Sequence, residues 1–337
     1  MNYAVPKMVD DLGQLSKFYT DFPRKSLPKK LRKKTRSMPV TLFFWPFLKF
    51  TRSETSGIEE LINLMRSFIG QLWILLTSRK DEVIYTFNSN AFILIFFGRK
   101  IILEATIAPK VIECRNIGLQ RVGIFKKMYS NLEIYEYRNA LNIVAPSQWV
   151  KSGITSLVGD AKIYVCEYGV NQQYWKTNIE IKREDKQVVF VGKFGKRKGA
   201  DLLVKLATAN PTWSFKIAGE VSYRSEFPDN MTFLGKCSRD EVRALFWNST
   251  CLVLPSRCEG SATVFYEAGS CGLPILASST SGLPLFSDKN LILDFTDEIS
   301  LDEIVGGFEE RFEANLKLYS IESYYSRLKY VIDQTKG

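Results

Sequence analysis

Residues 251–268 read CLVLPSRCEGSATVFYEA, and this stretch decides the expected fold. Residues 251–254 form a short apolar run that Pro255 stops, which is typical of a buried strand. A loop of small residues follows, and the next segment is predicted to be a helix. Glu259 lies on the loop, and Glu267 lies about one turn inside the helix. This order indicates an α/β sheet with a ligand site at the carboxyl end of the strand.

The small residues of this loop favour a bound ligand. Gly260, Ser261 and Ala262 carry little side chain, so a ligand can approach their backbone, and the free N–H groups of a helix start attract anions. The carboxylate of Glu267 can accept hydrogen bonds from ribose hydroxyls, as an acidic residue does in dinucleotide folds, while Glu259 stays nearer a sugar. The alternative is a solvated helix face whose carboxylate the helix dipole stabilises.

A second segment strengthens the prediction of a ligand site. Residues 188–203 read VVFVGKFGKRKGADLL, which predicts a β-branched strand, a basic turn with glycines and a helix that opens at Ala200. Lys193 and Lys198 can supply point charges to a pyrophosphate without a metal ion, and the glycines let the chain bend around it. The alternative is an ordinary basic surface loop.

Taken together, six segments of the chain resemble glycosyltransferase family 4 in order and spacing. They are residues 190–199, 215–220, 233–235, 254–256, 259–267 and 271–278. The resemblance covers the C-terminal half and implies the GT-B fold, an α/β architecture of two Rossmann-like domains that face a central cleft.

The resemblance also implies roles for individual residues. Lys193 and Lys198 would lie at the donor diphosphate and Glu259 near the donor sugar, and these three form the implied catalytic group. Lys193 stands where the family usually has arginine, which keeps the charge but loses the bidentate fork. Glu267 would bind the ribose. The other implied donor-binding residues are Gly192, Gly219, Gly235, Cys237, Gly260, Ser261, Ala262, Thr263 and Val264.

The same resemblance predicts the domain limits. An N-terminal acceptor-side domain is expected over residues 1–168, a donor-binding domain over 169–318, and a C-terminal helix over 319–337 that packs back toward the first domain. Residues 168–171 resemble the family's linker, with Asn171 in place of its aspartate. The alternative for the final helix is docking on its own domain.

The N-terminal half matches the family less well. Residues 1–6 are expected to form a curtailed strand, and the acceptor pocket cannot be read from them. Glu104 and Pro109 follow a strand-like run and are candidate acceptor-side residues, with a structural turn as the alternative.

The chemistry follows from which residue types are present. The chain has no histidine, which excludes Ser-His-Asp hydrolysis, Cys-His proteolysis and His-ligated zinc, so no metal site is predicted. Sugar transfer passes through an oxocarbenium-like state, and lysines with helix N–H groups can stabilise the departing phosphate. If the acceptor attacks the face that the nucleotide leaves, the phosphate oxygen can take the proton.

The resemblance, together with this chemistry, implies a retaining, metal-independent glycosyltransferase. It would move a hexosyl unit from a UDP- or GDP-linked sugar, its co-substrate, to a glycan or glycolipid acceptor in cell-surface polysaccharide assembly, with no further cofactor. The alternatives are a non-catalytic sugar-nucleotide-binding protein and a sugar-nucleotide epimerase of the same fold. A nucleic-acid-binding protein is disfavoured, because the aromatic residues do not interleave with the basic run.

Charge and cysteines suggest where the protein acts. Six cysteines without a C-x-x-C pair predict buried free thiols, and the absence of a cleavable apolar N-terminal segment favours the cytoplasm. The net charge is +10, and residues 24–36 hold eight basic residues directly before an aromatic stretch at 41–50. Residues 24–50 therefore predict peripheral contact with an anionic membrane, with a solvated basic loop as the alternative.

Overall fold

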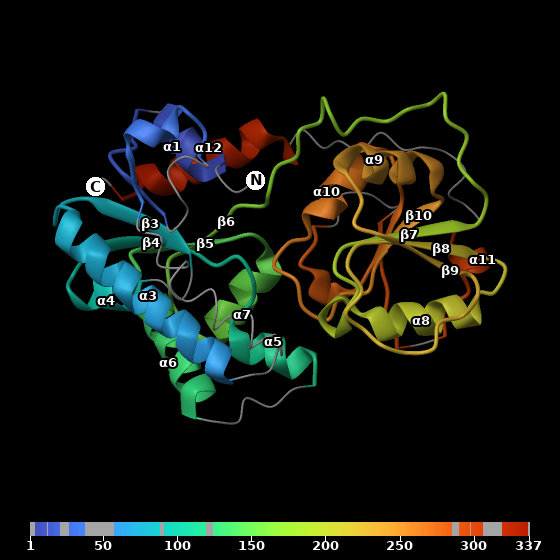
Figure 1. Cartoon of the computed structure of the whole chain (residues 1–337), viewed down its shortest axis with the longest axis horizontal. Helices are drawn as coiled ribbons and strands as arrows, with labels where there is room; N and C mark the ends of the chain where they lie inside the picture. Colours follow the sequence, from blue (N-terminus) through green and yellow to red (C-terminus); the bar gives the residue numbers. More distant parts are fainter. Residues whose placement is uncertain are drawn as a thin grey trace. The chain divides into compact units, whose positions relative to one another are not determined.

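The computed structural model describes residues 4–11, 13–20, 27–37, 57–87, 91–118, 124–284, 290–296, 298–305 and 319–335. Contacts between Cα atoms divide the chain into two compact units. The first comprises Met1–Glu104 and Arg121–Ile143, and the second comprises Ala105–Gln120 and Val144–Gly337. Figure 1 shows the elements of both units. The domain boundaries predicted after residues 168 and 318 stay predictions.

Two sheets carry most of the strands. A four-stranded sheet has the order β3-β4-β5-β6, from Val83–Phe87, Lys100–Glu104, Asn142–Ala145 and Ile163–Val165. A six-stranded sheet in the second unit has the order β12-β11-β10-β7-β8-β9. In chain order its strands are Gln187–Val191, Ser214–Ala218, Met231–Gly235, Cys251–Leu254, Ile275–Ala277 and Asn290–Ile292. The strands predicted over residues 188–191 and 251–254 are thus confirmed.

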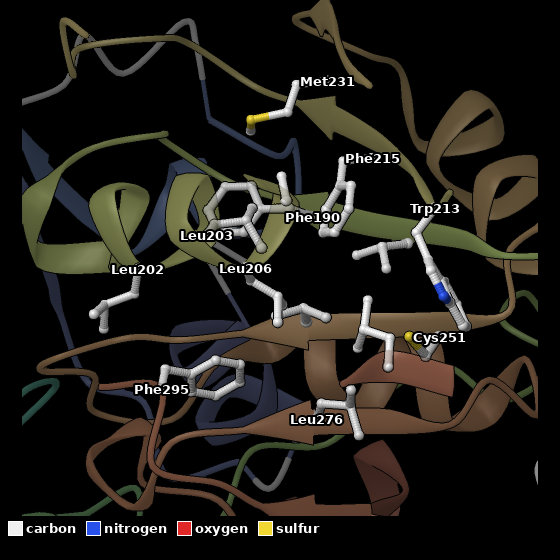
Figure 2. Packing of buried hydrophobic residues seen from close by; sticks show 14 of the residues in the cluster. Phe190, Leu202, Leu203, Leu206, Trp213, Phe215, Met231, Cys251, Leu276 and Phe295 are labelled. Atoms are coloured by element: carbon white, nitrogen blue, oxygen red, sulfur yellow. The ribbon is translucent and has the colours of Figure 1, made fainter. Parts of the chain in front are cut away.

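Every pairing in the six-stranded sheet is parallel. Such a sheet needs cover on both faces, and the side chains of β7 alternate accordingly. Val188 and Phe190 face a cluster that includes the leucines of α8 (Ala200–Ala209). Figure 2 shows Phe190 together with Leu202, Leu203 and Leu206. Val189 joins the opposite cluster, with side chains of α9 (Arg239–Asn248) and α10 (Thr263–Ser270). The result is a three-layer α/β unit.

The remaining described helices belong to one unit or the other. In the first unit they are α1 (Ala4–Asp11), α3 (Gly57–Thr77), α4 (Phe92–Phe96) and α6 (Ile124–Asn139). In the second they are α5 (Lys110–Asn116), α7 (Gln148–Val158), α11 (Leu301–Val305) and α12 (Ile321–Asp333). A small parallel pair, β1 (Phe18–Thr20) and β2 (Thr35–Ser37), lies in the first unit.

The start of the chain corrects one expectation. Residues 4–11 form helix α1, whereas a curtailed strand was expected over residues 1–6. Pro6 lies in the first turn, where proline is tolerated because the N–H groups there have no intrahelical partner. Asp10 and Asp11 of this helix pair with Lys34 and Lys30 of the basic run, so part of that run is held by ion pairs.

The structure describes only part of the segment, residues 24–50, that was predicted to contact a membrane. Residues 24–26 and 38–50 lie outside the described residues. Among the described helices, none combines the length and the apolar character needed to cross a bilayer.

The prediction of buried free thiols is confirmed for four of the six cysteines, whereas Cys114 and Cys237 are partly exposed. All six cysteines are free, and Cys166, Cys251, Cys258 and Cys271 are buried. Burial raises the pKa of the Cys251 and Cys258 thiols to about 12, so both stay protonated at neutral pH.

The final helix is anchored along the end of the predicted first domain. Tyr164 and Tyr168 make edge contacts with Tyr330 and Tyr324 of α12, and Arg327 donates to the Glu167 carbonyl at 2.7 Å. All of these residues belong to the second unit by its contacts. Packing of this helix on the N-terminal domain stays a prediction.

Candidate active site

The strand order creates a ligand position between two neighbouring strands. β7 pairs with β8 on one side and with β10 on the other, so the chain winds outward in opposite directions from β7 and β10. In doubly wound sheets, ligands bind outside the carboxyl ends of the strands at such a reversal point. The loops that leave β7 and β10 contain the predicted Lys198 and Glu259.

These two loops pack directly on each other. Gly199 has φ +74°, and a Cβ added there would lie 2.0 Å from the carbonyl oxygen of Pro255. The amide of Arg257 donates to the Arg197 carbonyl at 2.9 Å. Only glycine fits at position 199, because both the left-handed backbone and the close approach exclude a side chain.

A second close backbone contact lies at the ends of β7 and β8, between Gly192 and Gly219. Gly219 has φ +145°, and a Cβ there would lie 2.0 Å from the carbonyl oxygen of Gly192. Both glycines were predicted to bind the donor, and the structure gives Gly219 a packing reason as well. Their predicted role at the donor stays untested.

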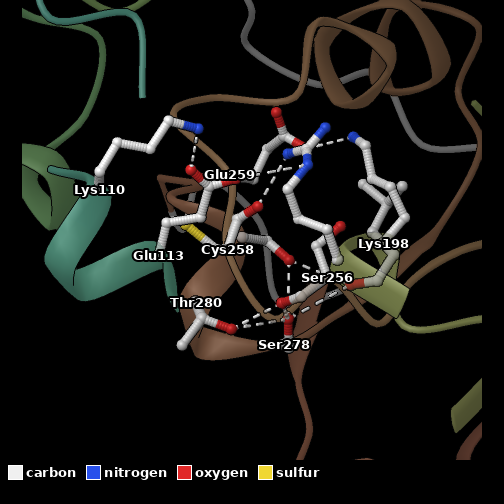
Figure 3. Close-up of polar contacts among 11 residues, drawn as sticks. Lys110, Glu113, Lys198, Ser256, Cys258, Glu259, Ser278 and Thr280 are labelled. Carbon is white, nitrogen blue, oxygen red and sulfur yellow. Dashed lines mark hydrogen bonds and ion pairs between the residues drawn. The ribbon is translucent and has the colours of Figure 1, made fainter. Parts of the chain in front are cut away.

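The charged centre of the site is the carboxylate of Glu259 (Figure 3). It forms an ion pair with the ammonium of Lys198 and accepts from Nη1 of Arg197 at 3.2 Å. The side chains of Lys198 and Glu259 are only 14% and 15% exposed. At such burial an unpaired charge is costly, so two cations hold one carboxylate in place.

The cluster extends beyond the predicted residues. Arg197 also donates to the Cys258 carbonyl at 2.9 Å, and its Nε lies 4.0 Å from the carboxylate of Glu113 on α5. Glu113 in turn pairs with Lys110. Neither Arg197 nor Glu113 was predicted as a site residue from the sequence. The run Lys196-Arg197-Lys198 does not show which basic side chain turns inward, and Glu113 is 146 positions from Glu259.

A second ion pair braces the same loops. Arg257 forms a bidentate ion pair with Asp201 at the start of α8, in which Nη2 of Arg257 lies 2.8 Å from Oδ2 of Asp201. Arg257 Nη1 also reaches the Lys196 carbonyl at 3.2 Å. This pair fixes the loop backbones without touching Glu259.

The loop before α10 is tightly packed. A Cβ on Gly260 would lie 1.9 Å from the Thr106 carbonyl oxygen, and Ser147 Oγ donates to the Gly260 carbonyl at 2.6 Å. The hydroxyls of Ser261 and Tyr266 lie 2.8 Å apart. The small size of Gly260 is therefore required by the neighbouring protein backbone, a constraint that the local sequence does not reveal.

The start of α10 presents open hydrogen-bond donors. Its N-cap is Ala262, which supplies no side-chain acceptor. Within the described part of the chain, no partner is found for the main-chain N–H groups of Ser261, Ala262, Thr263 and Val264. Amides at a helix N-terminus together with the helix dipole form an anion-binding position.

Glu267 lies one turn into α10 with an unusual protonation equilibrium. Burial raises the pKa of its carboxyl from 4.5 to about 7, and the charge of Arg239 opposes this shift only in part. The carboxyl group therefore changes charge near neutral pH. A bound hydroxyl group that donates a hydrogen bond to it would stabilise its ionised form.

The other predicted residues are distributed over several loops. Lys193 is exposed on the loop after β7, and Gly235 ends β9 with φ +68°. Cys237 is half-buried, and burial raises the pKa of its thiol. Glu104 ends β4 in the first unit, where it is buried and accepts from the Tyr85 hydroxyl at 2.5 Å. Pro109 is the N-cap of α5 in the second unit.

Fold and site together define an α/β protein with a charged cluster at the reversal point of a parallel sheet, and sequence comparison makes the class specific. Residues 171–291 match the family model described as Glycosyl transferases group 1. The chain is 28% identical over 268 residues to an uncharacterized 41.2 kDa protein in the cps region of Klebsiella pneumoniae, covering 73% of this chain and 68% of that one. Relatives that carry the name glycosyltransferase match over less than half of their own length.

Solved structures agree at the level of the fold. WaaG, a glycosyltransferase involved in lipopolysaccharide biosynthesis, superposes with a TM-score of 0.64 at 14% identity, over 98% of this chain and 90% of that one. HepE from Anabaena, in complex with UDP and glucose, gives a TM-score of 0.59 at 14% identity, over 79% and 82%.

These matches support the assignment of residues 171–291 to the group 1 glycosyl transferases, and the chain has the GT-B fold. The family, the fold class and the assignment as a glycosyltransferase enzyme are therefore confirmed. Members of this family use nucleotide sugars as co-substrates.

Proposed function

We propose that the protein is a retaining, metal-independent glycosyltransferase that moves a hexosyl unit from a UDP- or GDP-linked sugar to a glycan or glycolipid acceptor. One observation carries the proposal. Lys198, Arg197 and Glu259 converge at the point where the strand order reverses, while the start of α10 offers four open amides. Cations and amides suit a diphosphate, and carboxylates suit carbohydrate hydroxyls.

Donor binding would exchange partners within this cluster. The diphosphate takes the place of Glu259 as the partner of Lys198 and accepts from the amides of α10. Arg197 keeps its contact with Glu259, so that the carboxylate is not left unpaired when it turns to the sugar. Glu267 accepts hydrogen bonds from the ribose hydroxyls in its ionised form.

The transferred sugar passes through a state with oxocarbenium character, in which negative charge grows on the leaving diphosphate. Lys198 and the helix amides stabilise that charge without reorganising, because the protein already holds them in place. Attack by the acceptor on the face that the nucleotide leaves lets a phosphate oxygen take the acceptor proton. This route retains the anomeric configuration and needs no protein base, in keeping with a chain that has no histidine.

The relatives support the choice of substrates. HepE was crystallised with UDP and glucose, the Klebsiella relative is encoded in a cps region, and WaaG is involved in lipopolysaccharide biosynthesis. We therefore favour a role in cell-surface polysaccharide assembly. Acceptor contacts of Glu104 and Pro109, cytoplasmic location and membrane contact through residues 24–50 remain predictions.

Thermal-shift measurements against UDP, GDP and their sugars test the donor site, since a ligand that binds only the native state raises the apparent stability. We expect one nucleotide series to raise the melting temperature of the wild type and Glu267→Ala to weaken that effect. Analysis of the product anomer, with and without EDTA, then tests retention and metal independence and separates transfer from epimerisation. The donor site is misassigned if no nucleotide shifts the melting temperature.

A further inference from the structure

The turn that follows β11 contacts the loop that contains Glu259. This turn is the short helix η4 (Ser279–Ser281), and β11 pairs in parallel with β10, so the loops that follow the two strands leave the same edge of the sheet. The amide of Glu259 donates to the carbonyl of Thr280 at 3.1 Å. The hydroxyl of Thr280 donates to the carbonyl of Ser256 at 2.6 Å. Thr280 thus fixes the loop at two points, one at its start and one at Glu259.

Neighbouring hydroxyls brace the same turn. Ser278 also donates to the Ser256 carbonyl, and Figure 3 shows the contacts of Ser278 and Thr280 with this residue. The hydroxyl of Ser281 lies 2.9 Å from that of Ser278 and donates to the carbonyl of Leu254, the last residue of β10, at 3.0 Å. Ser256 is fully buried, so these donors satisfy a carbonyl that is shielded from water. The turn is therefore tied to the end of β10.

Gly282 brings the end of the turn against the same loop. It has φ +64°, and a Cβ added there would lie 2.6 Å from the carbonyl oxygen of Gly260 and 3.0 Å from that of Glu259. The left-handed backbone and the close approach both favour glycine at this position. The turn therefore touches the main chain of Glu259 and of the residue that follows it.

These contacts differ in kind from the ion pairs of the Glu259 carboxylate. In the proposed function the diphosphate takes Lys198 from Glu259, and Arg197 remains as the partner of the carboxylate. The contacts of the turn are made to main-chain atoms, so they persist when the side chain changes partners. Because a misplacement of about 1 Å can cost about 10²-fold in rate, support of this backbone bears directly on sugar transfer.

We propose that Thr280 is a positioning residue for Glu259. Its hydroxyl and its carbonyl hold the loop so that the carboxylate meets the hydroxyls of the donor sugar. The inference rests on the proposed function, in which Glu259 contacts the sugar while Lys198, the start of α10 and Glu267 contact the nucleotide. Thr280 should therefore matter for the sugar and not for the nucleotide.

Calorimetric titration of the full chain with UDP, GDP, UDP-glucose and GDP-mannose tests the proposal. Thr280→Val keeps the shape of the side chain and removes its hydroxyl. We expect its affinity for the nucleotide sugar to fall about five-fold, the typical effect of one lost hydrogen bond, and its affinity for the bare nucleotide to stay within about two-fold of the wild type. Thr280→Ser keeps the hydroxyl and is expected to restore the affinity for the nucleotide sugar.

Thr250→Val is the matched control. The hydroxyl of Thr250 donates to the carbonyl of Glu184 at 2.9 Å, directly before β10, which begins at Cys251. The same chemical change is thus made at the opposite end of the same strand. We expect both valine variants to lower the melting temperature and only Thr280→Val to change the ratio of the two affinities.

A second comparison asks whether Thr280 acts through Glu259. In the Glu259→Gln background, Thr280→Val should leave the affinity for the nucleotide sugar within about two-fold, because the carboxylate that it positions is already gone. In the absence of any donor, backbone hydrogen exchange over residues 256–262 should be faster in Thr280→Val than in the wild type and unchanged in Thr250→Val.

Three results would overturn the proposal. The first is a Thr280→Val variant that binds the nucleotide sugar like the wild type, or that loses the bare nucleotide to the same extent. The second is a loss of equal size in the Glu259→Gln background. The third is unchanged hydrogen exchange over residues 256–262. A wild type that binds none of the four compounds contradicts the proposed function itself, and the exchange measurement then still decides whether Thr280 holds the loop.

Discussion

The guanidinium of Arg197 donates to the carboxylate of Glu259 at 3.2 Å, while the same carboxylate pairs with Lys198. One acidic group is thus shared by two cations on the loop after β7. If Lys198 serves the diphosphate, Arg197 is the group that keeps Glu259 neutralised and oriented. This relationship gives the first prediction.

Replacement of Arg197 by glutamine should weaken donor binding. Lys198 would then be the remaining cation on Glu259, and a diphosphate would have to break that pair and leave a buried carboxylate unpaired. We expect the dissociation constant of the nucleotide sugar to rise about ten-fold, which is about 1.4 kcal/mol. Isothermal titration calorimetry measures it.

Arg257→Gln is the matched control for this experiment, because Arg257 braces the same loops through Asp201 without touching Glu259. It should lower thermal stability and leave donor affinity within about two-fold of the wild type, well under 1 kcal/mol. Equal losses of affinity in both variants would show that Arg197 acts only by holding the loops.

Replacement of Lys198 by alanine should lower turnover. Loss of one preorganised donor to a developing oxyanion typically costs about 10²–10³ in kcat, and we expect a loss of about 10² here. Steady-state kinetics at saturating donor give the number. Lys196→Ala removes an exposed lysine from the same turn and should retain most of the activity. Similar kinetics for the two variants would contradict the assignment of Lys198.

Donor affinity should depend on pH through Glu267. The pKa of its carboxyl is about 7, so the ionised form that accepts ribose hydroxyls grows as the pH rises from about 6 to 8. We expect nucleotide binding by the wild type to strengthen over this range and binding by Glu267→Gln to be weaker and nearly flat. A pH-dependent titration that is identical for both proteins would exclude this role.

The same group should affect folding stability. Its pKa is raised from 4.5 to about 7 in the folded protein, so its contribution is fully present below about pH 4.5 and is lost as the pH rises through about 7. Glu267→Gln should therefore melt at a higher temperature than the wild type at about pH 8, and the difference should shrink toward about pH 4. Melting curves across this range measure the effect.

Gly260→Ala should disrupt the loop before α10. Its Cβ would lie 1.9 Å from the Thr106 carbonyl oxygen, and backbone atoms on both sides must then move. We expect a loss of about 2–4 kcal/mol in the free energy of unfolding, as for other severe steric changes, together with loss of nucleotide binding. Chemical denaturation measures the first effect.

Gly70→Ala is the counterpart in α3, where a Cβ meets nothing within 4 Å. Because glycine weakens a helix interior, this change should stabilise the protein by about 0.5–1 kcal/mol. A Gly260→Ala variant as stable as the wild type would mean that the packing against Thr106 does not constrain the loop.

Local sequence patterns predicted much of the second unit. The strand over residues 188–191, the helix opening at Ala200 and the helix that contains Glu267 were all expected from apolar runs and their stops, and β7, α8 and α10 confirm them. Such signals are readable because strand and helix periodicities are properties of neighbouring residues. The strand predicted at the start of the chain was wrong, because a short apolar segment fits a strand or a helix equally well.

The candidate site was predictable only in its parts. Lys198 and Glu259 each follow a strand, and the sequence indicated their loops as parts of one site, which stays a prediction. Their ion pair depends on β7 and β10 being neighbours, which no local pattern specifies. Arg197 and Glu113 were missed because a basic run and a distant helix reveal their partners only after folding.

The sequence by itself determined the family, the alternation of strands and helices, and the loops that bear the charged groups, because short-range periodicity and motif spacing encode these features. Tertiary structure alone decided that two cations share Glu259, that burial shifts the pKa of Glu267, and that Thr280 lies against the loop of Glu259. Each of these depends on which surfaces meet, and those contacts join residues far apart in the chain.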